Sequence, residues 1–325
     1  MRGIVPAGRE ASPKFSAMIE TRFKIAMLVV VAIFASFPIM GILRGTTLPP
    51  IGPDLPEAPA VDVQTAGADE SPIEEAAVSI PAGPFIRGTI AGGFDEQPVQ
   101  SIYLDAYTID TYEVTNHHYA AFVAATNHRK AGPPSRYAKN MARMRGINQP
   151  VVYVSWDDAD AYCRWKGKRL PTEAEWEKAM RGGDKRLWPW GNEVDPLASN
   201  WAVAKDGHEV AAPVGSFKRD VSPFGVVDGA GNVIEWVADW YGEGAYRDPV
   251  DKNPKGPEFG TFRVLRGGGY TTSGTDVRVT SRNKMVPDFR DETIGFRCAV
   301  SGVQNEGFTQ AVKGGKVTRN QSSRE

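Results

Sequence analysis

Five segments are visible in the pattern of hydrophobic and polar positions along the chain. The first 24 residues carry mainly basic charges, and residues 25–42 form an apolar run, IAMLVVVAIFASFPIMGI, that contains no charged side chain. At about 1.5 Å of rise per residue, a helix of this run reaches roughly 27 Å, close to the minimum for crossing the hydrocarbon core of a bilayer. The pattern therefore predicts one transmembrane helix over residues 25–43.

The charges beside the apolar run set its expected orientation. Arg22 and Lys24 precede the run, Arg44 follows it closely, and the residues after Arg44 are acidic. By the positive-inside rule, residues 1–24 stay in the cytoplasm and the remainder of the chain is exported. We therefore expect a single-pass membrane protein whose main domain is extracytoplasmic, and periplasmic in a bacterium. A cleaved signal peptide is the alternative, but the residues after the run lack the small side chains that cleavage requires.

The remaining segments differ in composition. Residues 44–78 are rich in Pro, Ala and acidic residues, as in LPPIGPDLPEAPAV, and predict an extended, solvated linker. Residues 302–325 are polar and basic, which is typical of a flexible tail. Residues 79–301 lie between them and are expected to form one domain with a sizeable core.

Three helices are predicted inside this block from their N-terminal signals. Thr172 and Glu175 form a capping box, and the helix that they begin ends at Gly182 and the glycine after it. Ser155 begins a second helix in the same way. A third helix begins at Thr115 and places three apolar side chains on one face, those of Tyr119, Phe122 and Val123.

Composition and charge exclude some classes of partner. The chain has 41% hydrophobic and 24% charged residues, as folded proteins do, and a net charge of -1. The chain therefore lacks the excess of cations that would favour nucleic acid as a partner.

All eight tryptophans fall between Trp156 and Trp240, which indicates core packing. Residues 187–269 are rich in Gly, Pro, Asn and Asp, and they predict long ordered loops that need something to hold them.

Only two cysteines occur in the chain, Cys163 and Cys298. In an exported domain, an isolated pair predicts one disulfide, which would tie the end of the domain to its middle. Two buried free thiols are the alternative, and they would suit a cytoplasmic chain better.

A glycine-rich turn between two acidic residues offers candidate oxygen ligands. The turn runs from Asp228 to Glu235 with the sequence DGAGNVIE. Calcium prefers several oxygen ligands at once, including backbone carbonyls that such turns expose. The spacing is not that of an EF-hand, and Glu235 can equally pair with an arginine, so both interpretations stay open from these residues alone.

Several motifs, taken together, resemble the sulfatase-modifying-factor family, whose best-known member is the formylglycine-generating enzyme. In chain order they are IPAGPFIRG, YTIDTYEVTNHHYAAF, RLPTEAEWE, WPWGN, GNVIEWVADW, RVLRGGGY and IGFRCAV. The resemblance covers nearly the whole block, and RLPTEAEWE followed by GNVIEWVADW is highly specific. It implies an α+β domain of the formylglycine-generating-enzyme-like fold, which is related to C-type lectins and has little regular secondary structure.

The resemblance also implies metal sites and a disulfide. Members of the family commonly bind two structural calcium ions. The first would be held by the side chains of Asn200 and Asp206 and by the backbone carbonyls of Trp201 and His208. The second would be held by the side chains of Asp228 and Glu235 and by the backbone carbonyls of Gly231 and Val233. The family's disulfide at these positions would join Cys163 to Cys298.

The match to the family ends at its catalytic copper site. The enzyme oxidises a substrate cysteine to formylglycine with oxygen and a copper(I) ion held by two cysteine thiolates, and copper(I) selects such soft ligands. In this chain Thr272 takes the place of the first thiol, and the second falls near Val277. We therefore expect Tyr270, Thr272 and Val277 to mark a vestigial active-site region that binds no copper.

Two other groups of residues are weaker candidates. Related sulfoxide synthases hold iron with histidines, but adjacent His117 and His118 on a helix would point about 100° apart and would not readily chelate one metal. Four arginines follow the glycine-rich motif: Arg278, Arg282, Arg290 and Arg297. Each of them either lines the former active-site face or pairs with an acid. Pairing with acids is the favoured interpretation.

These observations predict a membrane-anchored, non-catalytic module that binds a protein or peptide partner in the cell envelope. The alternative is a divergent enzyme of the same family, either an oxidase acting on protein cysteine or a non-haem metal oxygenase. Metal content and the fate of a cysteine peptide distinguish the two hypotheses.

Overall fold

The computed structural model describes residues 71–132, 141–202, 206–248 and 250–302. The expected transmembrane helix over residues 25–43, most of the expected linker and the tail after residue 302 lie outside these ranges. Within the described ranges, no helix has the length and apolar character needed to span a membrane.

Three small sheets form the domain. The first has the order β1-β4-β9, the second pairs β2 with β3, and the third has the order β7-β6-β5-β8. Their bounds are β1 Ala77–Ile80, β2 Gly83–Arg87, β3 Gln100–Leu104, β4 Tyr107–Asp110, β5 Ile234–Trp240, β6 Arg263–Arg266, β7 Arg282–Met285, β8 Ile294–Phe296 and β9 Ala299–Ser301. All pairings are antiparallel except that of β5 with β8, which places the end of the chain beside its middle.

The three predicted helices are present and begin at the predicted caps. They are α2 Asn116–Thr126, α3 Trp156–Trp165 and α4 Glu173–Arg181. The side chains of Thr115, Ser155 and Thr172 accept hydrogen bonds from the free backbone N–H groups of the first turns. Single 3-10 turns lie at η1 Phe94–Glu96, η2 Met141–Met144 and η3 Gly274–Val277.

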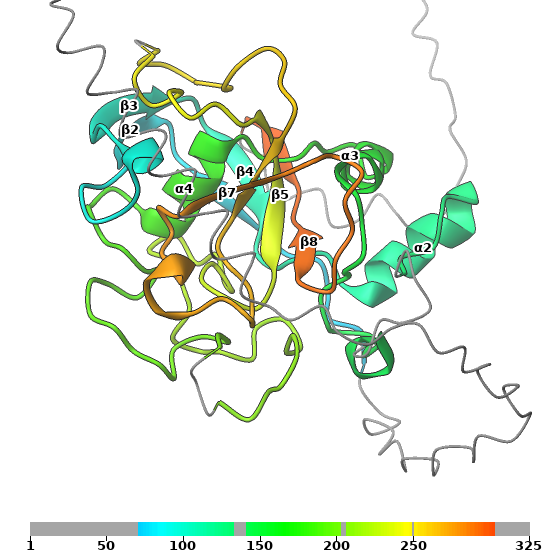
Figure 1. The fold of residues 1–325 in the computed structure, drawn as a ribbon. Helices are drawn as coiled ribbons and strands as arrows, with labels where there is room; N and C mark the ends of the chain where they lie inside the picture. Colours follow the sequence, from blue (N-terminus) through cyan, green and yellow to red (C-terminus); the bar gives the residue numbers. More distant parts are fainter. Residues whose placement is uncertain (1–70, 133–140, 203–205, 249, 303–325) are drawn as a thin grey trace, which may run out of the picture. The chain divides into compact units, whose positions relative to one another are not determined.

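The four-stranded sheet separates two parts of the core (Figure 1). On one side α4 packs against β2, β5 and β6, with Trp176 fully buried. On the other side α3 packs against β5 and α2, with Trp236 fully buried. The concentration of tryptophan therefore serves core packing at these two positions, as the sequence predicted.

Long segments without regular structure connect these elements. Between α4 and β5 no described residue belongs to a helix or strand, and the longest loops therefore precede β5. The fold is a mixture of helix and sheet with little regular secondary structure, as expected.

Cross-links hold the ends of this domain. Cys163 of α3 and Cys298, which lies between β8 and β9, form a disulfide, and both residues are fully buried. The predicted disulfide is thus present. At the other end, Asn148 accepts a hydrogen bond from the N–H of Ile73 and donates one to the carbonyl of Ser71. Contacts with the domain therefore begin several residues before the expected boundary at residue 79.

Candidate functional site

The glycine-rich turn after β6 forms the centre of the candidate site. Gly267 and Gly268 have φ angles of +92° and +69°, a region that favours glycine. A Cβ on Gly267 would lie 3.0 Å from the ring of Trp176. A Cβ on Gly269 would meet only ordinary contacts, from 3.4 Å outward. The fold therefore requires the first two glycines but leaves room for a side chain at Gly269.

Thr272 and Val277, which the resemblance predicts to stand in place of the two thiols, both lie next to Gly268. A Cβ on Gly268 would be 3.0 Å from a methyl group of Val277 and 3.2 Å from the methyl group of Thr272. The hydroxyl of Thr272 accepts a hydrogen bond from the N–H of Gly269 at 2.9 Å. Val277 is fully buried in an apolar cluster with Trp188 and Trp201. The side chains that meet at Gly268 are therefore a hydrogen-bonded hydroxyl and a buried alkyl group.

Tyr270 lies on the other side of the turn. It is buried in a cluster with Met144 and Tyr153, and its N–H donates to the carbonyl of Asn232. Tyr153 has a φ of +58°, which is strained for a bulky side chain, and its hydroxyl donates to Glu292 at 3.1 Å. The sequence did not indicate Tyr153 or Glu292, because the pattern of hydrophobic and polar residues around Tyr153 gives no sign of a positive φ.

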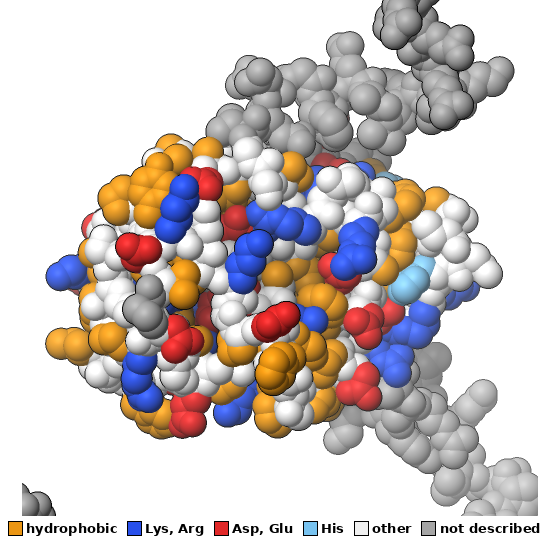
Figure 2. Space-filling view, turned by 90° about the horizontal axis from the view of Figure 1, so that it is seen from above, with side chains coloured by type: hydrophobic (Ala, Val, Ile, Leu, Met, Phe, Trp, Pro, Cys, Tyr) orange, Lys and Arg blue, Asp and Glu red, His pale blue; other side chains and the backbone are white. Residues whose placement is uncertain are grey.

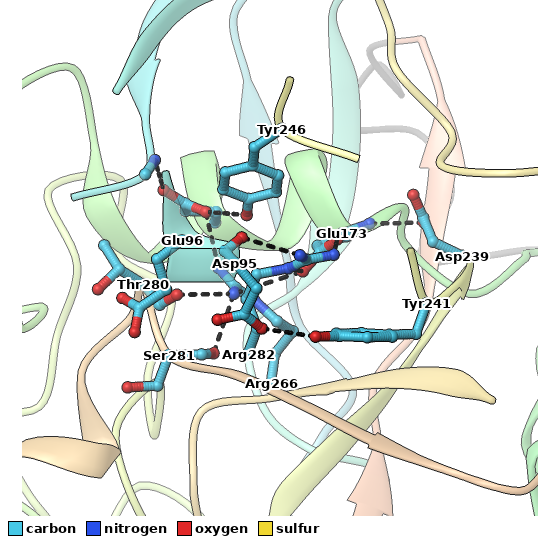
Figure 3. A network of polar contacts seen from close by, with 12 residues as sticks. Asp95, Glu96, Glu173, Asp239, Tyr241, Tyr246, Arg266, Thr280, Ser281 and Arg282 are labelled. Atoms are coloured by element: carbon cyan, nitrogen blue, oxygen red, sulfur yellow. Dashed lines mark hydrogen bonds and ion pairs between the residues drawn. The ribbon is translucent and has the colours of Figure 1, made fainter. Parts of the chain in front are cut away.

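A buried ionic network surrounds Arg266, the residue directly before the glycine-rich turn (Figure 3). The guanidinium of Arg266 donates to Glu177 at 2.7 Å and to the carbonyls of Val279, Thr280 and Ser281. Both Arg266 and Glu177 are fully buried. Because the network spans α4, β6 and the segment before β7, it holds the turn in one position relative to the core.

Three of the four arginines that follow the turn pair with buried acids. Arg278 pairs with Glu96 at 3.1 Å, Arg282 with Glu173 at 2.7 Å and Arg297 with Glu235 at 2.7 Å. For these three arginines the favoured interpretation, pairing with acids, is confirmed, and their charges are balanced by buried carboxylates. Arg290 is half-buried in the loop between β7 and β8.

The residues of the first expected calcium site fit a hard cation. Asn200 and Trp201 are buried, and the Nδ2 of Asn200 donates to the carbonyl of Val210. Asp206 accepts the N–H of His208 through Oδ1, while its buried Oδ2 has no hydrogen-bond partner among the residues that the structure describes. A buried carboxylate oxygen without a donor is costly unless a cation neutralises it. Carboxylate, amide and carbonyl oxygens are also the ligands that calcium prefers.

The residues of the second expected site form the turn that enters β5. Oδ2 of Asp228 accepts the N–H of Gly215 at 2.6 Å. A Cβ on Gly231 would lie 2.2 Å from the carbonyl oxygen of Asn200, so this position needs glycine and touches the first site. Val233 is buried beside it. Glu235 pairs with Arg297 and accepts a hydrogen bond from the indole N–H of Trp176 at 3.0 Å. The alternative interpretation of Glu235, pairing with an arginine, is therefore observed.

Two further buried acids surround this turn. Asn232 donates to both oxygens of Glu113, and Asp220 accepts the N–H of Ala230. Burial raises the pKa of Glu113 well above its usual range, and the charge of Asp228 adds to this. Burial likewise raises the pKa of Asp228 to about 6. Glu113 and Asp220 belong to no recognised motif, and the sequence therefore did not indicate either of them as part of the site.

The histidines are engaged in local contacts. Nδ1 of His118 lies 2.9 Å from the hydroxyl of Thr115, and Nε2 of His128 lies 2.9 Å from Asp158. In the parts of the chain that are described, no three His, Cys, Asp or Glu side chains gather to hold a metal. The two expected calcium sites use only two side chains each, so they stay predictions.

The surface of the domain has mixed charge. Figure 2 shows acidic and basic side chains interspersed over one face, with hydrophobic side chains in several groups between them. Among the exposed apolar side chains, Val194 and Leu197 belong to the loop that carries Trp188 and Trp201. Through these two tryptophans the loop packs against Val277, and thus borders the region predicted to be a vestigial active site.

Comparison with known proteins gives consistent matches. The family model described as sulfatase-modifying factor enzyme 1-like domain matches residues 63–301. The formylglycine-generating enzyme of Streptomyces coelicolor is 36% identical over 279 residues, which cover 68% of this chain and 88% of that protein. The inactive C-alpha-formylglycine-generating enzyme 2 of Mus musculus is 33% identical over 281 residues, covering 70% and 86%. The solved structure of PvdO from Pseudomonas aeruginosa is similar with a TM-score of 0.60 and 28% identity, covering 72% of this chain and 100% of that chain.

Proposed function

Because this chain belongs to the sulfatase-modifying factor enzyme 1-like family, we propose that it is a membrane-anchored member that binds a polypeptide in the cell envelope without oxidising it. The observation that carries the proposal is the pairing of Thr272 with Val277 around Gly268. A hydroxyl that already accepts an N–H and an alkyl side chain cannot replace two thiolates, because copper(I) requires soft ligands. The only two cysteines of the chain are joined to each other.

The vestigial region supports binding because it is rigid and partly apolar. Arg266, which directly precedes the glycine-rich turn, is held by its bond to Glu177. Next to the turn, Trp188 and Trp201 pack against Val277. Val194 and Leu197 are each 57% exposed on the bordering loop. Rigid surfaces with apolar anchors lose little conformational entropy when they bind a partner, and this favours a protein or peptide ligand.

The proposal includes structural calcium at the first site. Asn200 and Asp206 would hold the ion through their side chains, and Trp201 and His208 through their backbone carbonyls. The support is the buried Oδ2 of Asp206, to which no described residue donates a hydrogen bond. A bound ion there would stiffen a long loop that contains neither helix nor strand.

We further propose export of the domain beyond a membrane. The support is the apolar run at residues 25–42 with basic residues before it, together with the disulfide, which suits an oxidising compartment. The domain would then work within reach of the bilayer, on a linker of about thirty residues.

The named relatives agree with a fold that serves more than one function. One is called a formylglycine-generating enzyme and another an inactive form of it, although both are similar to this chain over more than four fifths of their own lengths. Function in such folds resides in the site residues and not in the scaffold.

A divergent enzyme is the second candidate, and one observation favours it. The strained backbone of Tyr153 places its hydroxyl on Glu292 beside Tyr270, and strain of this kind is often found at active sites. Such an enzyme would need a redox metal or another reactive group in this region.

Two measurements on the full chain in detergent test the proposal. Elemental analysis should find no stoichiometric copper or iron, and mass spectrometry should find a cysteine peptide unchanged after incubation with oxygen and copper(I). The Streptomyces relative serves as the positive control for the peptide assay. Conversion of the cysteine to an aldehyde by the wild-type chain would overturn the non-catalytic proposal, as would a bound redox metal that supports oxygen consumption with the peptide.

A further inference from the structure

We infer that the guanidinium of Arg297 takes the place of a calcium ion at the second expected site, so that this chain holds one calcium ion instead of two. The inference deepens the proposed function, because it relies on the first site as the one that takes calcium. Its evidence is separate, and it concerns the contacts of Arg297, Glu235 and Asp228.

Arg297 is surrounded by oxygen atoms of the kind that calcium would use. Nε and Nη2 donate to the carboxylate of Glu235 at 2.7–3.0 Å, and Nη2 also donates to the carbonyl of Asp228 at 3.1 Å. Nη1 donates to the carbonyls of Asp110 and Thr111 at 3.3 and 2.9 Å. All three nitrogens therefore have acceptors, and the side chain is fully buried. A guanidinium thus supplies a positive charge inside a mixed shell of carboxylate and carbonyl oxygens.

Glu235 has no acceptor capacity left for an ion. A carboxylate offers about four lone-pair positions on its two oxygens. Oε1 is contacted by Nε and Nη2 of Arg297, and Oε2 by Nε of Arg297 and by the indole N–H of Trp176. These four contacts use both oxygens, and they lie between fully buried side chains that cannot move into solvent. Calcium would have to displace one of these donors, which would then be left without a partner.

The other side-chain ligand of the second site is also engaged. Asp228 gives its carbonyl to Arg297, and its Oδ2 accepts the N–H of Gly215. Calcium needs six to eight oxygen ligands, and without Glu235 the expected set is reduced to Asp228 and the two backbone carbonyls of Gly231 and Val233. Arg297 meanwhile joins β8 to β5 and to the end of β4. It therefore performs the cross-linking that a second ion would otherwise provide.

Calcium stoichiometry tests the inference. The full chain in detergent is stripped with a chelator and dialysed against buffered calcium, and the bound ion is then counted by elemental analysis. We expect one calcium ion per wild-type chain, none in Asp206→Asn and one in Asp228→Asn. Two ions in the wild type, or loss of an ion in Asp228→Asn, would overturn the inference. Absence of calcium from the wild type would instead contradict the proposed first site, so the two failures are distinguishable.

A gain of binding provides a second test. Arg297→Met removes the guanidinium but keeps an unbranched side chain, and it frees three of the four acceptor positions of Glu235. We expect this variant to bind one more calcium ion than the wild type and to show a larger rise of melting temperature with calcium. The double variant Arg297→Met/Asp228→Asn is the matched control and should lose that gain. An Arg297→Met chain that folds without gaining an ion contradicts the inference. If Arg297→Met does not fold, the ion count of Asp228→Asn alone tests the inference.

Discussion

Removal of the disulfide should lower the stability of the domain by a calculable amount. Cys163 and Cys298 are separated by 135 residues in sequence. In the chain-entropy model, a loop of this length contributes about 5 kcal/mol, because the cross-link restricts the unfolded chain. Single domains have unfolding free energies of about 5–15 kcal/mol, so this bond supplies a third or more of the total. We therefore expect Cys163→Ala/Cys298→Ala to be close to unfolding at physiological temperature.

Urea unfolding monitored by tryptophan fluorescence measures this loss. The midpoint of the double variant should fall, and its m-value should rise, because an unfolded chain without the cross-link exposes more surface. Wild-type chain in reductant is the matched comparison, since it loses the bond but keeps both sulfur atoms. Reductant should not change the double variant. If the double variant and the oxidised wild type unfold at the same urea concentration, the loop-closure reasoning is wrong for this protein.

Three other changes test the site and its supports. Thr272→Cys/Val277→Cys should bind one copper(I) ion that neither single variant retains, as measured by competition with a chromophoric chelator; no uptake would contradict the paired geometry. Glu177→Gln should lower the unfolding free energy by about 3–5 kcal/mol, because it removes the negative charge that pairs with two buried arginines, Arg266 and Arg181, and a loss under 1 kcal/mol in urea unfolding would refute this. Burial raises the pKa of Asp239 from 3.8 to about 8. The stabilisation of the folded state that comes from binding this proton is therefore complete below pH 4 and is lost as the pH rises through 8. Melting curves should show this alkaline loss in the wild type and not in Asp239→Asn, and equal curves would contradict it.

Local signals made the three helices predictable. Thr115, Ser155 and Thr172 each mark a helix start, because a side-chain oxygen that satisfies free N–H groups acts within four residues. Gly182 marks an end for an equally local reason, since its φ is +78°. The assignment of Thr272 and Val277 to a vestigial site comes from the resemblance to the family, and it stays a prediction.

Long-range contacts account for what the sequence did not reveal. Glu235 and Arg297 are far apart in sequence, and their pairing depends on the parallel alignment of β5 with β8. Glu113 becomes part of the same buried group only because Asn232 reaches it from another loop. The strain at Tyr153 arises from tertiary contacts as well, among them the bond from its N–H to the carbonyl of Asp291.

The contact between the two loops of the expected calcium sites has a mechanical consequence. The carbonyl of Asn200 accepts the N–H of Asn232, and the carbonyl of Asn232 accepts the N–H of Tyr270. Two hydrogen bonds thus transmit any displacement of the first loop to the glycine-rich turn. A calcium ion bound at the proposed first site would therefore restrict the movement of the glycine-rich turn, and the free calcium concentration around the domain would set how rigidly this turn is presented to a partner.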